Sequence, residues 1–210
     1  MDWRSTPELV TVAADRYGDA EALVDGDLRL SFRDLANEVR RAAKGFVAAG
    51  VAPGDRVGIW APNVGEWVVA AFGVHAAGGV LVPVNTRFKG EEAAWVLGRS
   101  GARLVLTVTG FLGTDYVAML QDVDDVEQVV VLRGDAAGGT TSWADFLAAG
   151  ADVEDAAAGG DELRQFETVD HVARDELVER GVAGEVELLV PAPERGAVAV
   201  ELFELVGGER

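Results

Sequence analysis

Short apolar segments alternate with amphipathic ones from residue 57 to residue 149, and this alternation limits the chain to one class of fold. Residues 57–61 are apolar with no alternating polar positions, which is typical of a strand buried on both faces of a parallel sheet. Strands of this type are expected at 57–61, 80–84, 104–108 and 129–132, and helices at about 64–77, 91–99, 115–120 and 142–149. This order predicts an α/β fold, a doubly wound, mostly parallel sheet with flanking helices and right-handed crossovers.

The residues before this alternation contain a predicted hairpin and a predicted helix. Asp25-Gly26-Asp27 separates two apolar segments, and Asp and Gly readily adopt the left-handed conformations of a tight hairpin turn. Ser31 then offers an N-cap oxygen, with Asp34 three residues later. Apolar residues recur at helical spacing from Phe32 until Gly50, so a helix is expected there.

One apolar segment, residues 67–83, approaches the length that spans a membrane, and His75 is its only ionisable residue. Gly78-Gly79 divides it into a helical half, which Asn63 is expected to cap with Glu66 as the partner in a capping box, and a β-branched half. The apolar side of the helical half is formed by Trp67, Val68, Ala71, Phe72 and His75. We interpret the segment as a buried helix followed by a buried strand, so no membrane span is expected.

The charge and the cysteine content exclude several classes of function. A formal net charge of −18 and a pI near 4.4 argue against a nucleic-acid partner or an anionic membrane surface, because both would repel the chain. There is no cysteine, so disulfides and thiolate catalysis are excluded and a cytoplasmic location is expected. The N-terminus has no basic region followed by an apolar stretch, so no secretory signal is expected.

The last 60 residues differ in composition from the first 150. Residues 151–210 carry 5 basic and 16 acidic side chains, a net charge of −11, which leaves −7 for residues 1–150. A linker is expected at 151–160, a charged helix at 161–180, and a hairpin of 185–190 with 197–206. We therefore divide the chain into an α/β domain, 1–150, and a divergent acidic α+β tail, 151–210, of unknown role.

Several spaced phrases in the first 150 residues resemble the opening of acyl-CoA synthetases, which belong to the AMP-binding, adenylate-forming enzyme family. The first are Leu-Ser-Phe-Arg-Asp-Leu at 30–35 and Gly-Val-Ala-Pro-Gly-Asp-Arg-Val-Gly-Ile at 50–59. Pro-Asn with Glu-Trp at 62–67, Gly-Gly-Val-Leu-Val-Pro-Val-Asn at 78–85 and Glu-Glu followed by Ser-Gly-Ala at 91–102 then occur in the family's order. The resemblance is to the N-terminal portion of the family only.

The resemblance implies a reaction that this chain is not equipped to perform alone. A complete family member uses ATP, Mg and coenzyme A to convert a carboxylic acid, fatty or otherwise hydrophobic, into an acyl-adenylate and then an acyl-CoA. The family's phosphate loop ending in Pro-Lys-Gly, its ribose-binding Asp and the lysine of its C-terminal domain have no counterparts in the sequence. Gly138-Gly139-Thr140-Thr141 has the composition of a phosphate loop but no lysine, and we interpret it as a helix entry. We therefore expect a truncated ligase that is inactive and binds no cofactor alone.

The candidate cofactor-binding residues are Asn85, Thr86 and Arg87, directly after a predicted strand. Doubly wound sheets bind ligands outside the carboxyl ends of their strands, where these residues are expected. Arg87 or Lys89 could contact a phosphate of coenzyme A, and the alternative is that both are solvated loop charges. No catalytic residue and no metal ligand is assigned, because the two histidines, His75 and His171, lie far apart in the sequence.

Two classes of function remain open from the sequence. The chain is either a fragment of an acid:CoA ligase, with a carboxylic acid as substrate only when the missing segments complete it, or a non-catalytic binding or interaction module derived from such an enzyme. A frameshift would produce the same break in the pattern near residue 155. The sequence does not predict the oligomeric state.

Overall fold

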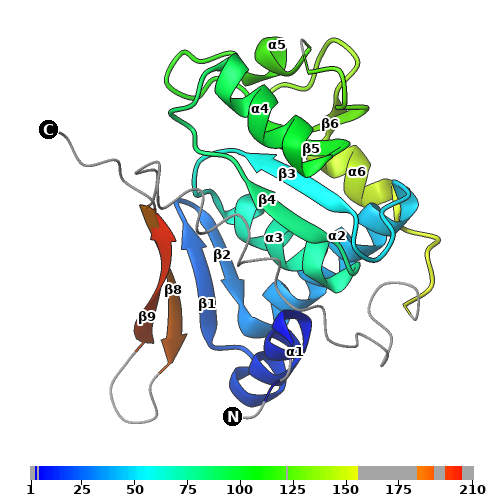
Figure 1. The fold of residues 1–210 in the computed structure, drawn as a ribbon. Coiled ribbons are helices and arrows are strands. Elements are labelled where there is room, and N and C mark those ends of the chain that lie inside the picture. The colour runs from blue at the N-terminus through cyan, green and yellow to red at the C-terminus, as the bar shows by residue number, and fades with distance from the viewer. Residues whose placement is uncertain (1–2, 4, 122, 156–183, 192–196, 205–210) are drawn as a thin grey trace, which may run out of the picture. The chain divides into compact units, whose positions relative to one another are not determined.

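The computed structural model describes residues 3, 5–121, 123–155, 184–191 and 197–204. The chain divides into two compact units, Met1–Arg164 and Gln165–Arg210. The described elements of the first unit are α1 (Thr6–Tyr17), β1 (Glu21–Asp25), β2 (Leu28–Ser31), α2 (Phe32–Ala48), β3 (Arg56–Trp60), α3 (Gly65–Ala76), β4 (Val80–Pro83), α4 (Gly90–Ser100), β5 (Leu104–Val108), α5 (Tyr116–Leu120), β6 (Gln128–Arg133), β7 (Thr141–Ser142) and α6 (Trp143–Ala149) (Figure 1). The second unit contains β8 (Gly184–Pro191) and β9 (Ala197–Glu204).

Five strands of the first unit form a parallel sheet in the order β4-β3-β5-β6-β7. Every residue of β5 and the last four residues of β3 are buried, as the unpatterned apolar sequence of these strands predicts. The predicted doubly wound sheet with flanking helices is therefore confirmed. Two elements were not predicted from the sequence: β7, which is only two residues long, and α1.

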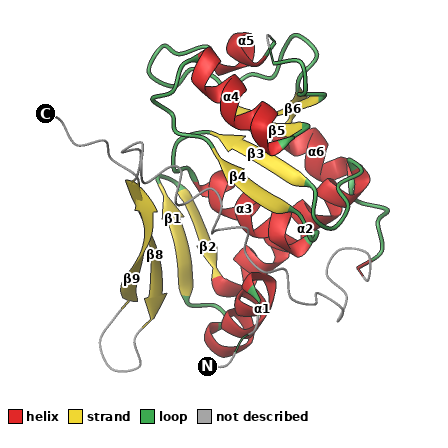
Figure 2. Ribbon diagram, viewed as in Figure 1, coloured by secondary structure: helices red, strands yellow, loops and turns green. Residues whose placement is uncertain are grey.

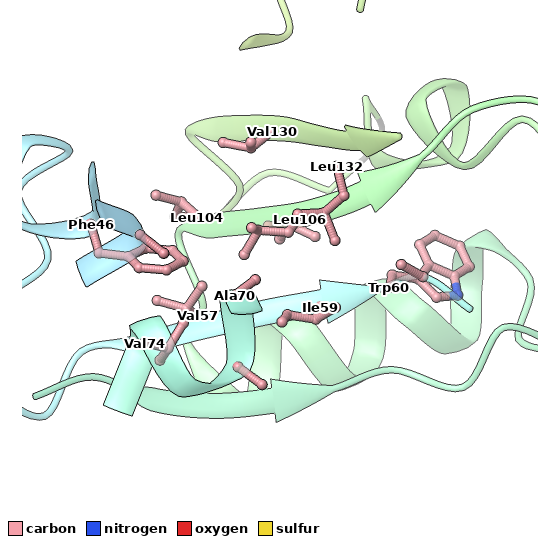
Figure 3. Packing of buried hydrophobic residues seen from close by; sticks show 14 of the residues in the cluster. Phe46, Val57, Ile59, Trp60, Ala70, Val74, Leu104, Leu106, Val130 and Leu132 are labelled. Carbon is pink, nitrogen blue, oxygen red and sulfur yellow. The ribbon is translucent and has the colours of Figure 1, made fainter. Parts of the chain in front are cut away.

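The connections between the strands place helices on both faces of the sheet. β4 and β5 follow β3 in the chain but lie on opposite sides of it, and right-handed crossovers then put α3 and α4 on opposite faces. Figure 1 shows α4 and α5 on one side of the sheet and α2 and α3 on the other. In the core, Ala70 and Val74 of α3 lie next to Val57 of β3 (Figure 3).

The N-terminal hairpin and the start of α2 agree with the prediction. β1 and β2 pair antiparallel around the expected turn, in which Gly26 has a positive φ of 59°. At the start of α2, Ser31 Oγ accepts a hydrogen bond from the Asp34 backbone N–H, and an Asp34 carboxylate oxygen accepts one from the Ser31 N–H, both at 3.1 Å. This is the predicted capping box.

The apolar segment 67–83 forms most of α3 and all of β4, so the expected helix and strand are both present. The expectation that the strand is buried is wrong, because β4 lies at the edge of the sheet, with Val80 to Val82 only partly buried and Pro83 exposed. Among the described residues, no helix is both long and apolar enough to cross a membrane. α3 packs against α2 at a point where only a glycine fits, because a Cβ on Gly73 would lie 2.6 Å from the Cβ of Ala42. This contact fixes which side of α3 faces inward.

The predicted cap of α3 is wrong. The N-cap position is Val64, not Asn63, and no side chain caps it locally. The carboxylate of Asp25, at the end of β1, accepts a hydrogen bond from the Gly65 N–H at 2.8 Å instead. A local pattern could not show this contact, because the oxygen comes from 40 residues away.

Glu66 forms an ion pair with Arg133 rather than a capping box. The Arg133 guanidinium at the end of β6 reaches oxygens of both Glu66 and Asp25 at 2.5 Å. The Gly65 N–H, and then Arg133, lower the pKa of Asp25 below its ordinary value. These side chains connect the hairpin, the start of α3 and the end of β6.

In the second unit, β8 and β9 pair antiparallel, with Gly184 opposite Glu204 and Pro191 opposite Ala197. The hairpin expected here is thus present in the described residues. The expected helix at 161–180 and the second half of the expected linker at 151–160 lie outside the part that the structure describes. The predicted domain boundary at residue 150 stays a prediction.

We predict that Gly73→Ala destabilises the protein. The methyl group would collide with the Cβ of Ala42, which is fixed to the backbone and cannot rotate away. Overpacking of this kind costs about 1–3 kcal/mol, which should exceed the gain of at most about 1 kcal/mol from the higher helix propensity of alanine. Urea unfolding measures the difference. The control is Gly90→Ala in α4, where the nearest atom would lie at an ordinary 3.5 Å; equal stability of the two variants would contradict the prediction.

We also predict that Asp25→Asn lowers the free energy of unfolding by about 1 kcal/mol at pH 7 and by less in acid. The pKa of Asp25 is lowered in the folded protein, so the carboxylate stabilises the fold above its ordinary pKa of about 4, and this contribution disappears as the pH falls through the folded-state pKa. Unfolding in urea between pH 7 and pH 3 tests this. Asp27→Asn, an equal charge change at an exposed position of the same turn, is the control. A loss that does not depend on pH would show that the charge is not involved.

Candidate functional site

The carboxyl ends of the parallel strands form the edge of the sheet where a ligand site is expected. β3 lies between β4 and β5, so the direction of winding reverses at β3, and the crevice of such a sheet lies outside the ends of β3 and β5. The loops that reach this edge are residues 61–64, 84–89, 109–115 and 134–140, among those drawn in green in Figure 2.

The structure places the predicted site residues Asn85, Thr86 and Arg87 after β4, which is an edge strand of the sheet. They lie at the carboxyl edge, as expected, but one strand away from the reversal between β3 and β5. Their part in cofactor binding stays a prediction.

Several polar groups of this loop form hydrogen bonds within the protein. The Asn85 carbonyl accepts a hydrogen bond from the Trp60 indole N–H at 2.9 Å, and the Asn85 side-chain oxygen accepts one from the Arg87 backbone N–H at 2.9 Å. The Thr86 carbonyl accepts one from the Tyr116 hydroxyl at 3.0 Å. The loop is therefore held in a defined conformation, with the exposed Arg87 side chain at the surface.

Trp60 and Tyr116 pack beneath the loop of residues 84–89, on its side toward the protein core, and hold it in position. Their rings meet edge to face with centroids 4.8 Å apart, and both side chains are almost fully buried. Burial raises the pKa of the Tyr116 hydroxyl, which therefore remains a neutral hydrogen-bond donor. The pair is built to hold backbone in place rather than to transfer protons.

The loop after β5 contains a candidate residue that the sequence analysis missed. Leu112 has a positive φ of 50° and is 84% exposed, between Gly110 and Gly113, which also have positive φ values. A left-handed conformation is uncommon for a bulky residue, and such outliers occur often in ligand-binding loops. The pair of glycines three positions apart is the signal in the sequence that marks this tight loop.

Arg133 and the acidic side chains of the described residues offer no phosphate or metal site. Arg133, at the end of β6, is bound by two carboxylates and is not available to an added anion. Within the described ranges, no group of three or more His, Asp and Glu side chains is arranged to hold a metal ion. Burial lowers the pKa of His75, so it is neutral at pH 7, and His171 lies outside the described ranges.

A shallow depression of about 340 Å³ lies between α1 and α2, not among these loops. Its lining is Thr11, Ala14, Asp15, Arg33, Ala36, Asn37 and Arg40. The charges of this lining are mixed, with one carboxylate beside two guanidinium groups. It therefore has no clear preference for a ligand of either charge.

Comparison with known proteins identifies the family. Residues 10–178 match the family described as AMP-binding enzyme. A methyl-dioxo-octahydroindenyl-propanoyl:CoA ligase of Rhodococcus jostii is 41% identical over 151 residues, which cover 69% of this chain and 29% of the relative. A ligase of the same name from Mycobacterium tuberculosis is 38% identical over 159 residues, covering 75% and 31%.

A solved structure of similar fold supports the same assignment. An acyl-CoA synthetase of Brucella canis superposes with a TM-score of 0.58 at 25% identity, over 72% of this chain and 28% of that chain. This chain spans less than a third of the length of the curated relatives described above. The resemblance to acyl-CoA synthetases seen in the sequence is thus confirmed, and the match over most of its length shows that the chain belongs to the AMP-binding enzyme family.

Proposed function

We propose that the chain is the N-terminal α/β unit of an AMP-forming carboxylic acid:CoA ligase, a scaffold that forms neither acyl-adenylate nor acyl-CoA by itself. The observation that carries the proposal is the match of residues 10–178 to AMP-binding enzymes, together with CoA ligases as relatives. These relatives favour an origin in a ligase over a free-standing interaction module. ATP, Mg and coenzyme A are then the cofactors of a completed enzyme, and a cytoplasmic location stays a prediction.

The chemistry of adenylation supports the absence of activity. The reaction needs groups that hold a triphosphate and cations that stabilise the charge developing on the transferred phosphorus. The sequence lacks the lysine-containing phosphate loop of the family. At the described carboxyl edge, Arg133 is neutralised by Asp25 and Glu66, and the polar groups around Asn85 are bonded within the protein.

The names of the relatives suggest a class of acid. Both curated ligases are named for a propanoyl group attached to a fused bicyclic ring. We therefore propose a carboxylic acid with a bulky apolar body as the substrate of the completed enzyme. In the present chain Asn85, Thr86 and Arg87 remain the candidate contacts to a cofactor, with Arg87 as the exposed cation.

We predict that the purified chain releases no pyrophosphate above the blank when it is incubated with ATP, Mg and a panel of fatty, aromatic and alicyclic acids. The reason is that the sequence lacks the family's lysine-containing phosphate loop and that Arg133 is held by two carboxylates. A coupled pyrophosphate assay measures this, with the Rhodococcus jostii relative as the active control. Acid-dependent release by this chain alone would contradict the proposal.

A further inference from the structure

One side of α2 carries a row of basic side chains, although the chain has a net charge of −18. Arg33, Arg40 and Lys44 follow one another at intervals of seven and four positions. At 3.6 residues per turn they fall within an arc of about 40° and extend over about 16 Å of the helix. We call Arg33, Arg40 and Lys44 the α2 basic row. It is a local positive surface on an acidic protein, and such a surface attracts anions.

Two members of the row are only weakly neutralised by the described residues. Arg33 lies 3.6 Å from the carboxylate of Asp19, and both side chains are well exposed, so this pair contributes little. Arg40 donates a hydrogen bond to the side-chain oxygen of Asn37 at 3.0 Å, and no carboxylate of the described residues forms an ion pair with it. Asp15 lines the same shallow depression from α1 without forming an ion pair with either arginine. The Arg40 guanidinium therefore has donors left for a carboxylate.

The third member of the row binds a carboxylate from the end of the described α/β unit. Lys44 Nζ lies 2.7 Å from a carboxylate oxygen of Asp155, and the Lys44 side chain is only 21% exposed. The hydrogen bond from Lys44 lowers the pKa of Asp155 below its ordinary value, and the charge of Arg40 contributes in the same direction. A carboxylate at this end of the row is therefore stabilised by two of its cations.

Close packing of α6 on α2 directs the chain to this end of the row. Gly150 follows α6, and a Cβ on it would lie 2.5 Å from backbone atoms of both Lys44 and Gly45. The backbone therefore passes directly against α2 at Gly150, and Asp155 comes five residues later. The last described residues of the α/β unit thus lie beside the α2 basic row.

The sequence after Asp155 supplies two further carboxylates within reach of the row. Residues 156–160 are Ala-Ala-Ala-Gly-Gly, without charge or large side chains, and Asp161 and Glu162 follow. These residues lie outside the part that the structure describes, and they belong to the first unit, Met1–Arg164. Six residues from Asp155 to Asp161 reach up to about 20 Å. This reach exceeds the length of the row, so both carboxylates can arrive at either arginine.

We propose that the α2 basic row is a binding site for a carboxylate-rich peptide, and that its occupant is the chain's own segment beginning with Asp161 and Glu162. Tethering favours this occupant, because a ligand attached by a short flexible linker has an effective concentration of the order of millimolar. The net charge of −18 disfavours an acidic partner from outside and a second copy of the chain. The lining of the depression alone prefers neither charge; Lys44 and the tether supply the preference. The inference does not depend on the proposed function, since it uses only contacts within the first unit.

A spin label tests the proposal in the full chain. The sequence contains no cysteine, so Leu163→Cys provides a single attachment point for a nitroxide beside the two carboxylates. We expect the label to broaden the amide NMR signals of residues 11–15 and 33–40. The broadening should fall by about threefold or more in about 0.5 M NaCl, because salt screens exposed charges. Broadening confined to the residues around Lys44, or unchanged by salt, would overturn the proposal, because the tether alone would explain it.

Matched substitutions in α2 test the location of the site. Arg40→Gln should reduce the broadening of residues 33–37 by about twofold or more, as expected for the loss of one exposed ion pair. The control is Arg41→Gln, the same change of charge at the next residue, which lies outside the row and is paired with Glu38 at 2.7 Å. It should leave the broadening unchanged, and circular dichroism shows that both variants are folded. Equal effects of Arg40→Gln and Arg41→Gln would overturn the proposal, because the general charge of the helix would then be responsible.

Matched substitutions in the occupant test its identity. Asp161→Asn combined with Glu162→Gln should remove the salt-dependent broadening. Asp175→Asn combined with Glu176→Gln, an equal change of charge further along the chain, should leave it in place. The opposite result would show that another acidic segment occupies the row and would overturn the proposed occupant.

A mixed sample distinguishes the chain's own segment from that of a second copy. Spin-labelled chain without isotope label is mixed with isotope-labelled chain that carries no spin label. We expect no broadening in this mixture, because the tethered segment of each chain occupies its own row. Broadening of residues 33–40 in the mixture would show that the occupant comes from another copy, and would overturn the proposal.

Discussion

Burial of β3 and β5 on both faces determines how the rest of the first unit is arranged. Strands of this kind need a layer of helices above and below, and the reversal of the chain around β3 supplies α3 to one face and α4 to the other. The α4 layer packs closely on the sheet, since a Cβ on Gly58 of β3 would lie 2.7 Å from Leu97 of α4. The hydroxyl of Thr107, buried within β5, donates to the Trp60 carbonyl at 2.8 Å, so this polar group is satisfied inside the sheet.

The same arrangement determines what happens at the carboxyl edge. Four loops converge there, and several of their polar groups are bonded to the protein itself: Asn85 to Trp60, Thr86 to Tyr116, and Arg133 to the carboxylates of the hairpin and α3. Groups engaged in this way hold positions and have little capacity to transfer protons or bind phosphate. If the chain is a ligase scaffold, as we propose, this unit forms part of the wall of the active site. The residues that carry out the reaction then belong to the parts of a complete ligase that this chain does not match.

The sequence predicted those elements whose signal is local and strong. β3 and β5 were recognisable because burial on both faces removes polar residues from them, and α2 because Ser31 and Asp34 form a capping box. β4 has an equally apolar sequence, although it lies at the edge of the sheet and is only partly buried. α1 was missed because only Val10 and Ala13 are buried on it, so its apolar pattern is faint. The predicted cap of α3 was wrong because its oxygen comes from Asp25 on another element. Gly110 and Gly113 mark a tight loop in the sequence, but they do not indicate that Leu112 between them is also left-handed. The spacing of apolar residues predicts neither contacts between residues far apart in the sequence nor strained backbone conformations.

α3 shows most clearly why the orientation of an apolar helix is decided by packing and not by hydrophobicity. Trp67 and Phe72 are the largest apolar side chains of α3 and are only partly buried, whereas Ala70 and Gly73 are fully covered, because α2 approaches Gly73 so closely that no larger side chain fits. Turning the aromatic residues inward would bury more area but would separate α2 from α3 and lose the contacts of the whole helix pair. Leaving Trp67 and Phe72 partly exposed lowers the stability of the fold by about 25 cal/mol for each Å² of apolar surface that stays in water. The close contact at Gly73 therefore determines which side of α3 is buried, even though it leaves part of Trp67 and Phe72 in contact with water.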